Sequence, residues 1–179
     1  MPLICAIRYY RCVRLPSRFC GAFLGLTLLL VGSGCSRGSR PAGIGENAPD
    51  FTLQDPDRKI ALNQFRGQVV VLNFWATFCA PCVEEMPSLV EMQRRMKSKG
   101  VEVVAVSVDE DGNVYHQFVR EHNIDLVTVR DPRQTIAGLY GTFKFPETYV
   151  IDRNGVMRRK FIGAVDWTEP DITEFLGKL

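Results

Sequence analysis

The sequence predicts a mixed α/β domain in which helices flank a central β-sheet. Two predominantly apolar runs, 68–74 and 101–108, are typical of strands that are buried on both faces of a parallel sheet. A helical pattern lies between them. Towards the C-terminus, Asn154-Gly155 between two apolar segments predicts an antiparallel hairpin, so the sheet is expected to be mixed.

The remaining elements follow from turn residues and apolar spacing. Strands are bounded by glycine or Asx turns, and helices carry apolar residues three and four apart. In the second helix we expect Val114, Phe118 and Val119 to face the core, and we expect Thr168 to cap the last helix. The expected strands are 51–53, 59–61, 68–74, 101–108, 126–129, 148–151 and 156–162, and the expected helices are 82–98, 113–123, 134–140 and one that starts after Thr168.

Length and charge restrict the class of protein. A chain of 179 residues has room for one domain with a substantial core. The net charge of +2 depends on four arginines within residues 1–35, a segment without acidic residues. Without that segment 18 basic residues stand against 20 acidic ones, so no basic surface for nucleic acid is expected.

The N-terminal 35 residues have the layout of a secretory signal. A basic stretch precedes the apolar run Phe19–Val31, and small residues then lead to Cys35. The apolar run is short for a membrane-spanning helix. Cys35 after small residues resembles the lipobox of bacterial lipoproteins, although Gly32 stands where leucine is usual, so Cys35 is predicted to be lipidated. A plain signal peptide and an uncleaved anchor remain open, and all three place the domain outside the cytoplasm, in the periplasm.

Three regions are therefore expected along the chain. Residues 1–35 form a lipoprotein-type signal peptide, and residues 36–47, rich in Gly, Ser, Pro and Arg, form a flexible tether to the membrane. Residues 48–179 form the folded domain, which we expect to be monomeric.

Two cysteines of the folded domain, Cys79 and Cys82, mark its candidate site. The other four lie in the leader, so the pair is catalytic, metal-binding or incidental rather than one of several structural disulfides. Cys79 stands where a strand meets a helix, and the helix N-terminus favours a thiolate there. Pro81 suits the first helical turn because its missing N–H would have had no partner. Cys79 is the expected nucleophile and Cys82, one turn inside, the resolving thiol.

Three segments resemble a known family. They are Ala48-Pro49-Asp50-Phe51, the segment from Val71 to Cys82 (VLNFWATFCAPC) and Glu85-Met86-Pro87. Together they are similar to the TlpA/ResA-like thioredoxin-fold thiol–disulfide oxidoreductases, over residues 45–179. The resemblance implies a thioredoxin-like fold with an inserted strand–helix element and N-terminal short strands. It also implies an extracytoplasmic enzyme that reduces disulfides of partner proteins and receives electrons from a membrane thiol carrier. Apocytochrome c in cytochrome c maturation is the family's best-known substrate.

The resemblance also assigns roles to single residues. Cys79 and Cys82 match the redox-active pair, which would need no other cofactor and no metal. Pro146 matches a cis-proline beside that pair, and Phe145 would offer its backbone to an extended substrate. Pro87 matches a proline that kinks the helix, since it has no N–H to donate.

Aromatic and polar positions near the pair complete the expected site. Phe78 replaces the family's usual tryptophan and keeps an aromatic cover, and Trp75 is either core packing or part of the same cover. Asn73 stands where thioredoxins keep a titratable aspartate. The proton acceptor is therefore expected at Glu85, three residues after Cys82 on the same helical face. The expected substrate contacts are Trp75, Phe78, Pro81, Phe145 and Pro146.

Two other functions remain open. A copper-binding metallochaperone of thioredoxin fold would use the two cysteines with a histidine, although His116 and His122 are badly spaced for a shared ligand site. A peroxiredoxin-type peroxidase would need threonine three residues before the reactive cysteine, where this chain has Ala76.

Overall fold

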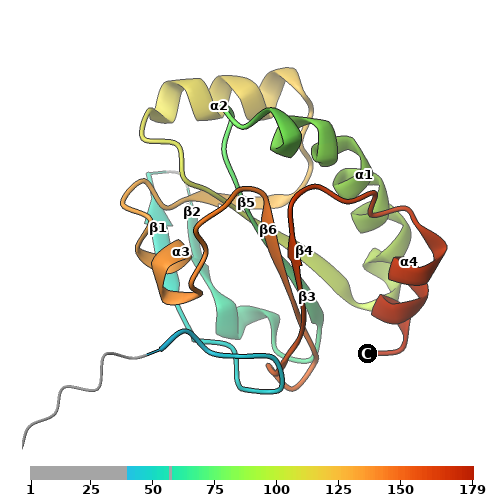
Figure 1. The fold of residues 1–179 in the computed structure, drawn as a ribbon. Coiled ribbons are helices and arrows are strands. Elements are labelled where there is room, and N and C mark those ends of the chain that lie inside the picture. Colours follow the sequence, from blue (N-terminus) through green and yellow to red (C-terminus); the bar gives the residue numbers. More distant parts are fainter. Residues whose placement is uncertain (1–39, 57) are drawn as a thin grey trace, which may run out of the picture. The chain divides into compact units, whose positions relative to one another are not determined.

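The computed structural model describes residues 40–56 and 58–179 (Figure 1). The predicted signal peptide, the predicted lipidation site Cys35 and residues 36–39 of the predicted tether lie outside the described residues. In the part of the chain that is described, no helix is long and apolar enough to cross a membrane.

A five-stranded mixed sheet forms the centre of the domain, in the order β5-β4-β3-β6-β7. The parallel strands β3, β4 and β5 are joined by helices, whereas β6 and β7 form the predicted antiparallel hairpin. A separate two-stranded hairpin, β1-β2, precedes the sheet in the chain. The strands are β1 (Thr52–Asp55), β2 (Arg58–Ala61), β3 (Val69–Trp75), β4 (Val101–Ser107), β5 (Val127–Arg130), β6 (Glu147–Ile151) and β7 (Met157–Ile162).

Helices lie on both faces of this sheet (Figure 1). The α-helices are α1 (Ala80–Met96), α2 (Gly112–Glu121), α3 (Thr135–Leu139) and α4 (Pro170–Gly177), and short 3-10 helices span Leu62–Phe65 and Lys97–Lys99. The predicted order of elements is confirmed, with boundaries that differ by a few residues. All seven residues of β3 are buried, as expected for a central strand with cover on both sides.

Alternation along the strands separates two core clusters, one on each face. The first contains Phe74 of β3 with residues of α3 and the β1-β2 hairpin. The second contains Trp75 with residues of α1, α2 and α4. Cys79 and Phe145, both partly buried, pack against both clusters. The two clusters therefore meet where the cysteine pair and the loop before β6 lie.

Two local predictions are wrong. Val114 of α2 is 48% exposed, and Tyr115 fills the core place instead, with its hydroxyl donating to Thr128 of β5 at 3.0 Å. Thr168 does not cap α4, which begins after Glu169 without a side-chain cap. The Thr168 hydroxyl donates instead to the Asp166 carboxylate at 2.5 Å. The Tyr115 hydroxyl has Thr128 as its partner, and the Thr168 hydroxyl has Asp166. The apolar spacing of the sequence indicates neither contact.

Candidate active site

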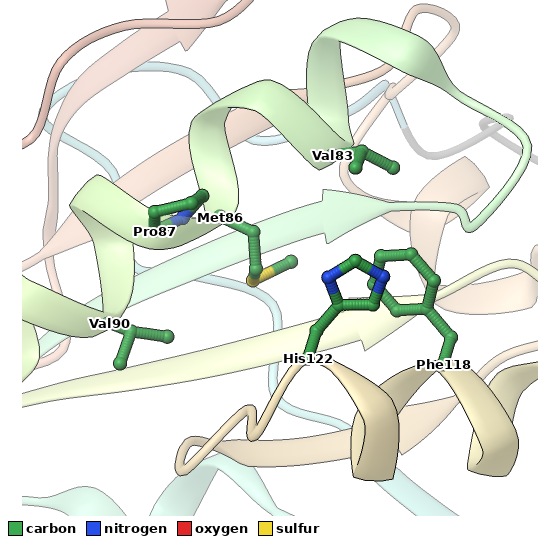
Figure 2. A pocket seen from close by; sticks show the side chains of 6 residues that line it. All are labelled: Val83, Met86, Pro87, Val90, Phe118 and His122. Atoms are coloured by element: carbon green, nitrogen blue, oxygen red, sulfur yellow. The ribbon is translucent and has the colours of Figure 1, made fainter.

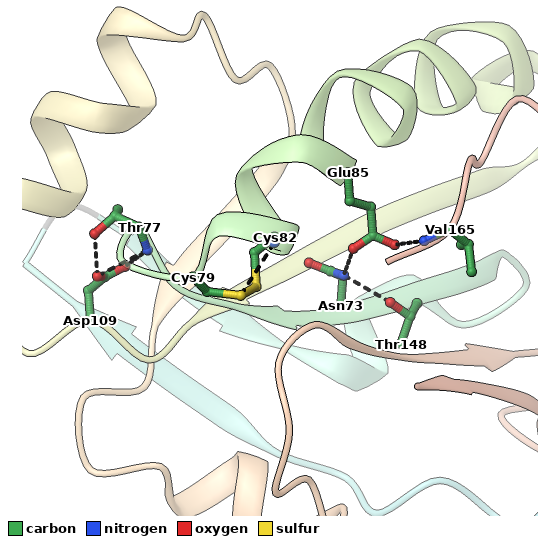
Figure 3. The surroundings of a disulfide bond; sticks show 8 residues. All are labelled: Asn73, Thr77, Cys79, Cys82, Glu85, Asp109, Thr148 and Val165. Atoms are coloured by element: carbon green, nitrogen blue, oxygen red, sulfur yellow. Dashed lines mark hydrogen bonds between the residues drawn. A yellow bond between two sulfur atoms is a disulfide. The ribbon is translucent and has the colours of Figure 1, made fainter. Parts of the chain in front are cut away.

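Cys79 and Cys82 form a disulfide at the start of α1, with their Cα atoms 5.2 Å apart (Figure 3). Cys79 is the N-cap residue of the helix, and its sulfur accepts a hydrogen bond from the Cys82 backbone N–H at 3.3 Å. Backbone donors and the positive end of the helix dipole stabilise a thiolate at this position. Cys79 is partly accessible whereas Cys82 is 1% exposed, so a substrate can reach only the first sulfur.

The loop before β6 brings the predicted dock to the disulfide. The Phe145–Pro146 peptide bond is cis, as the family resemblance implied. Phe145 packs against both core clusters, as Cys79 does. Pro81 is exposed in the first turn of α1, and the Phe78 side chain is 74% exposed, so both can contact a partner.

Trp75 has a different environment from the other predicted contact residues. Its side chain is fully buried, at ring-centroid distances of 6.2 Å from Tyr115 and 5.5 Å from Phe118. No part of Trp75 is available to a substrate in this oxidised structure. The structure thus places Trp75 in the core and leaves Phe78 as the aromatic cover.

Glu85 lies further along α1 than the disulfide, and its carboxylate points toward Asn73 (Figure 3). Its side chain is buried, and its carboxylate accepts hydrogen bonds from three neutral donors. The Trp167 indole Nε1 and the Val165 backbone N–H donate to Oε1 at 2.6 and 3.3 Å, and the Asn73 amide donates to Oε2 at 3.4 Å. The same amide donates to the Thr148 hydroxyl at 2.8 Å.

No cation compensates this buried carboxylate among the partners that the structure gives it. Burial therefore dominates and raises the pKa of Glu85 from 4.5 to about 7, although the donors from Trp167, Val165 and Asn73 lower it. A carboxyl with such a pKa can take up and release a proton near neutral pH. In Figure 3 the Asn73 side chain lies between Cys82 and the Glu85 carboxylate.

A second buried carboxylate, Asp109, holds the loop that leads to Cys79. Asp109 follows β4, and it accepts hydrogen bonds from the Thr77 backbone N–H at 3.1 Å, the Thr77 hydroxyl at 2.6 Å and the Ser107 hydroxyl at 2.5 Å. The ends of the parallel strands β3 and β4 are adjacent, and this brings Thr77 to the Asp109 carboxylate.

Glu147 is a functional candidate that sequence reasoning missed. It directly follows Pro146, is fully buried, and forms an ion pair with Lys160 of β7 at 3.1 Å. The Tyr149 hydroxyl donates to the same carboxylate oxygen at 3.2 Å, while the other oxygen has no partner among the described residues. An acidic residue directly after the predicted cis-proline was the available sequence signal.

An apolar pocket of about 280 Å³ lies beside the site, between α1 and the end of α2 (Figure 2). Its walls include Pro87 and Met86, and His122 stacks on Phe118 at 4.0 Å. His116 contacts Tyr115, with ring centroids 4.9 Å apart. Within residues 40–56 and 58–179, no cluster of three or more His, Cys, Asp or Glu is placed to hold a metal ion.

Comparison with known proteins gives consistent matches. Residues 44–160 match the model of the AhpC/TSA family. The thiol–disulfide oxidoreductases ResA of Bacillus thuringiensis (strain Al Hakam) and Bacillus subtilis (strain 168) are 35% and 32% identical over 137 and 133 residues. These alignments cover 76% and 74% of this chain and 78% and 73% of the relatives.

Solved structures show the same fold. A crystal structure from Chlorobium tepidum, assigned as a thiol:disulfide interchange protein DsbE, aligns with a TM-score of 0.67 and 32% identity. It covers 76% of this chain and 94% of that one. A secreted thiol–disulfide isomerase from Corynebacterium glutamicum aligns with a TM-score of 0.65 and 27% identity, over 73% and 85% of the two chains. The thioredoxin-like fold expected from the sequence is confirmed.

Proposed function

Because the chain belongs to the AhpC/TSA family and is homologous to the ResA oxidoreductases, we propose that it reduces disulfides of partner proteins outside the cytoplasm. It is a thiol–disulfide oxidoreductase with a CxxC pair. The observation that carries the proposal is the asymmetry of the pair: the Cys79 sulfur is partly accessible and accepts a hydrogen bond from the Cys82 N–H, and the Cys82 sulfur is buried.

In the proposed cycle the reduced Cys79 thiolate attacks one sulfur of a substrate disulfide. A mixed disulfide forms, and the other substrate sulfur leaves as a thiolate. Cys82 then gives its proton to Glu85 and attacks the Cys79 sulfur. The substrate's second sulfur leaves and is protonated, so two electrons pass to the substrate and the pair ends as the Cys79–Cys82 disulfide.

Glu85 is the proposed proton acceptor for Cys82. It stands one helical turn after Cys82, where both side chains share a face of α1. Its pKa of about 7 keeps it exchangeable at neutral pH, whereas Asn73 cannot titrate. We expect Glu85→Gln to remove one step from the pH profile of disulfide reduction, while Glu84→Gln on the exposed side of α1 leaves that profile unchanged.

The substrate is proposed to dock as an extended segment against the backbone of Phe145, with Phe78 and Pro81 beside it. Apocytochrome c is the proposed partner class, and a membrane thiol carrier is the proposed electron donor. Support comes from the ResA relatives and from the leader, whose Cys35 is proposed as a lipid anchor. A Cys35→Ala variant should lose both palmitate labelling and membrane fractionation. Retained labelling would refute that anchor without affecting the redox assignment.

The reduction potential of the pair tests the direction of electron flow. Equilibration with dithiothreitol or glutathione should give a value near that of thioredoxin, about −270 mV. A value near about −120 mV, typical of a strong oxidant, would overturn the reductase assignment.

Single cysteine variants test the order of attack. Cys79→Ser should abolish reduction of a model protein disulfide, and Cys82→Ser should accumulate a mixed disulfide that non-reducing electrophoresis detects. Equal residual activity in the two variants would contradict the assigned roles. Peroxide turnover by the wild-type protein should be negligible, because Ala76 replaces the threonine of the peroxidase pattern.

A further inference from the structure

Trp167 is the most distant contributor to the site in the sequence. It lies between β7 and α4, and its side chain is fully buried. The indole packs edge-on against Phe161, with centroids 5.1 Å apart. Its Nε1 donates to Glu85 Oε1 at 2.6 Å, the shortest of the hydrogen bonds to that carboxylate.

The segment around Trp167 is tied to α1 at a second point. Ser88, three residues after Glu85, accepts from the Trp167 backbone N–H at 3.2 Å, and its hydroxyl also lies 3.5 Å from the Val165 carbonyl. The Val165 N–H adds a second donor to Oε1. Both donors to Oε1 thus come from the segment between β7 and α4, called the C-terminal segment below (residues 163–169). Oε2 is left to accept from Asn73, on the side of the cysteine pair.

We propose that Trp167 is a positioning residue, whose indole N–H fixes the Glu85 carboxylate in the orientation that accepts the Cys82 proton. This inference rests on the proposed role of Glu85. A hydrogen bond to the ionised form of a carboxyl favours that form. The indole therefore also limits how far burial can raise the pH at which Glu85 titrates, without supplying a charge of its own.

The groups around Glu85 belong to four elements. Cys82 precedes it by one turn on α1, Asn73 of β3 donates to it and to Thr148 of β6, and the C-terminal segment contributes the two other N–H donors. The charged residues of that segment, Asp166 and Glu169, are both exposed, and Asp166 accepts from Thr168 instead. Cys79 and Cys82 are present in every variant below, so their own titration is common to all of them.

The chain contains a matched control for this tryptophan. Trp75 and Trp167 are its two tryptophans, and both are fully buried in the same core cluster. The Trp75 indole N–H, however, has no hydrogen-bond partner among the described residues. Trp75→Phe and Trp167→Phe therefore remove a similar volume, but only Trp167→Phe removes a donor to Glu85.

The test is the pH profile of disulfide reduction in the two variants. Loss of a donor to the carboxylate should move the Glu85 step in Trp167→Phe upward by about one pH unit, with activity about tenfold lower at pH 6 and equal to wild type above pH 9. Trp75→Phe should keep the midpoint of the wild-type profile. A wild-type midpoint in folded Trp167→Phe protein would overturn the proposal.

Fluorescence supplies a second readout that does not depend on activity or on the folding of Trp167→Phe. In Trp75→Phe the remaining emission comes from Trp167, and it should change with a midpoint near pH 7 that Glu85→Gln abolishes. Emission that is constant from pH 5 to 9 would also overturn the proposal. If this titration is present but Glu85→Gln leaves the pH profile of reduction unchanged, the proposed proton-acceptor role fails and the indole–carboxylate contact stands.

Discussion

Two buried glutamates lie on opposite faces of the sheet: Glu85 on the helix that carries the disulfide, and Glu147 directly after the cis-proline. Glu147 shares a face of β6 with Tyr149 and is paired with Lys160, while Glu85 reaches the other face from α1 and has only neutral donors. Although burial lowers the pKa of Lys160, its hydrogen bonds to Tyr149 and Glu147 raise it, so the ammonium stays charged beside the carboxylate. Glu147 thus has a cationic partner, whereas Glu85 has neutral donors only and can exchange a proton near neutral pH.

The two environments suit two different roles, a structural one for Glu147 and proton transfer for Glu85. In a buried ion pair each charge stabilises the other, and removing one partner leaves an uncompensated charge. A buried carboxyl that is hydrogen-bonded but not paired keeps a proton until the pH nears neutrality. The pairing on one face of the sheet fits a role for Glu147 in holding the loop at Pro146, and its absence on the other face fits proton transfer by Glu85.

The largest expected effect comes from removing the cation of the ion pair. Lys160→Met leaves the fully buried Glu147 carboxylate without its partner and should lower the free energy of unfolding by about 4 kcal/mol. Urea unfolding of the oxidised protein measures it, with Lys144→Met as the exposed control. A Lys160→Met/Glu147→Gln double variant should recover most of the loss; a double variant as unstable as the single one would show that the pair is not the cause.

The next effect is the pH dependence of stability that Glu85 contributes. Its pKa is raised from 4.5 to about 7 on folding, so its favourable contribution is complete below pH 4 and is lost as the pH rises through about 7. The shift corresponds to about 3 kcal/mol. Between pH 5 and 8 the wild type should therefore lose up to that amount relative to Glu85→Gln, as measured by urea unfolding. If the free energy of unfolding changed with pH in the same way in both proteins, the raised pKa of an unpaired Glu85 carboxyl would be contradicted.

The smallest effects come from two neighbouring residues of β6 that support different glutamates. Tyr149→Phe removes a hydroxyl that lies 3.2 Å from Glu147 and 2.8 Å from the Tyr140 carbonyl, and Thr148→Val removes the acceptor of the Asn73 amide. Each should cost about 1 kcal/mol in urea unfolding. Only Thr148→Val should also alter the pH profile of disulfide reduction, because only its partner contacts Glu85. A changed profile in Tyr149→Phe would show that the two faces are coupled.

The strand and helix order, the Cys79–Cys82 pair and its place at a helix start could all be predicted from the sequence. These features depend on residues close together in the chain: apolar periodicity, a proline in the first turn, and a glutamate one turn after the second cysteine. Local spacing was enough to nominate Glu85, and the family resemblance was enough to expect the cis-proline.

Which of these groups are buried, and which partners hold them, depends on the tertiary fold. Trp167 reaches Glu85 from 82 residues away, Asp109 reaches Thr77 from 32, and Trp75 is enclosed by aromatic residues of α2. Such contacts depend on how β7, α4 and α1 pack, and no periodic pattern encodes them. The proton chemistry of the site follows from that packing, because burial without a cation is what brings the pKa of Glu85 to about 7.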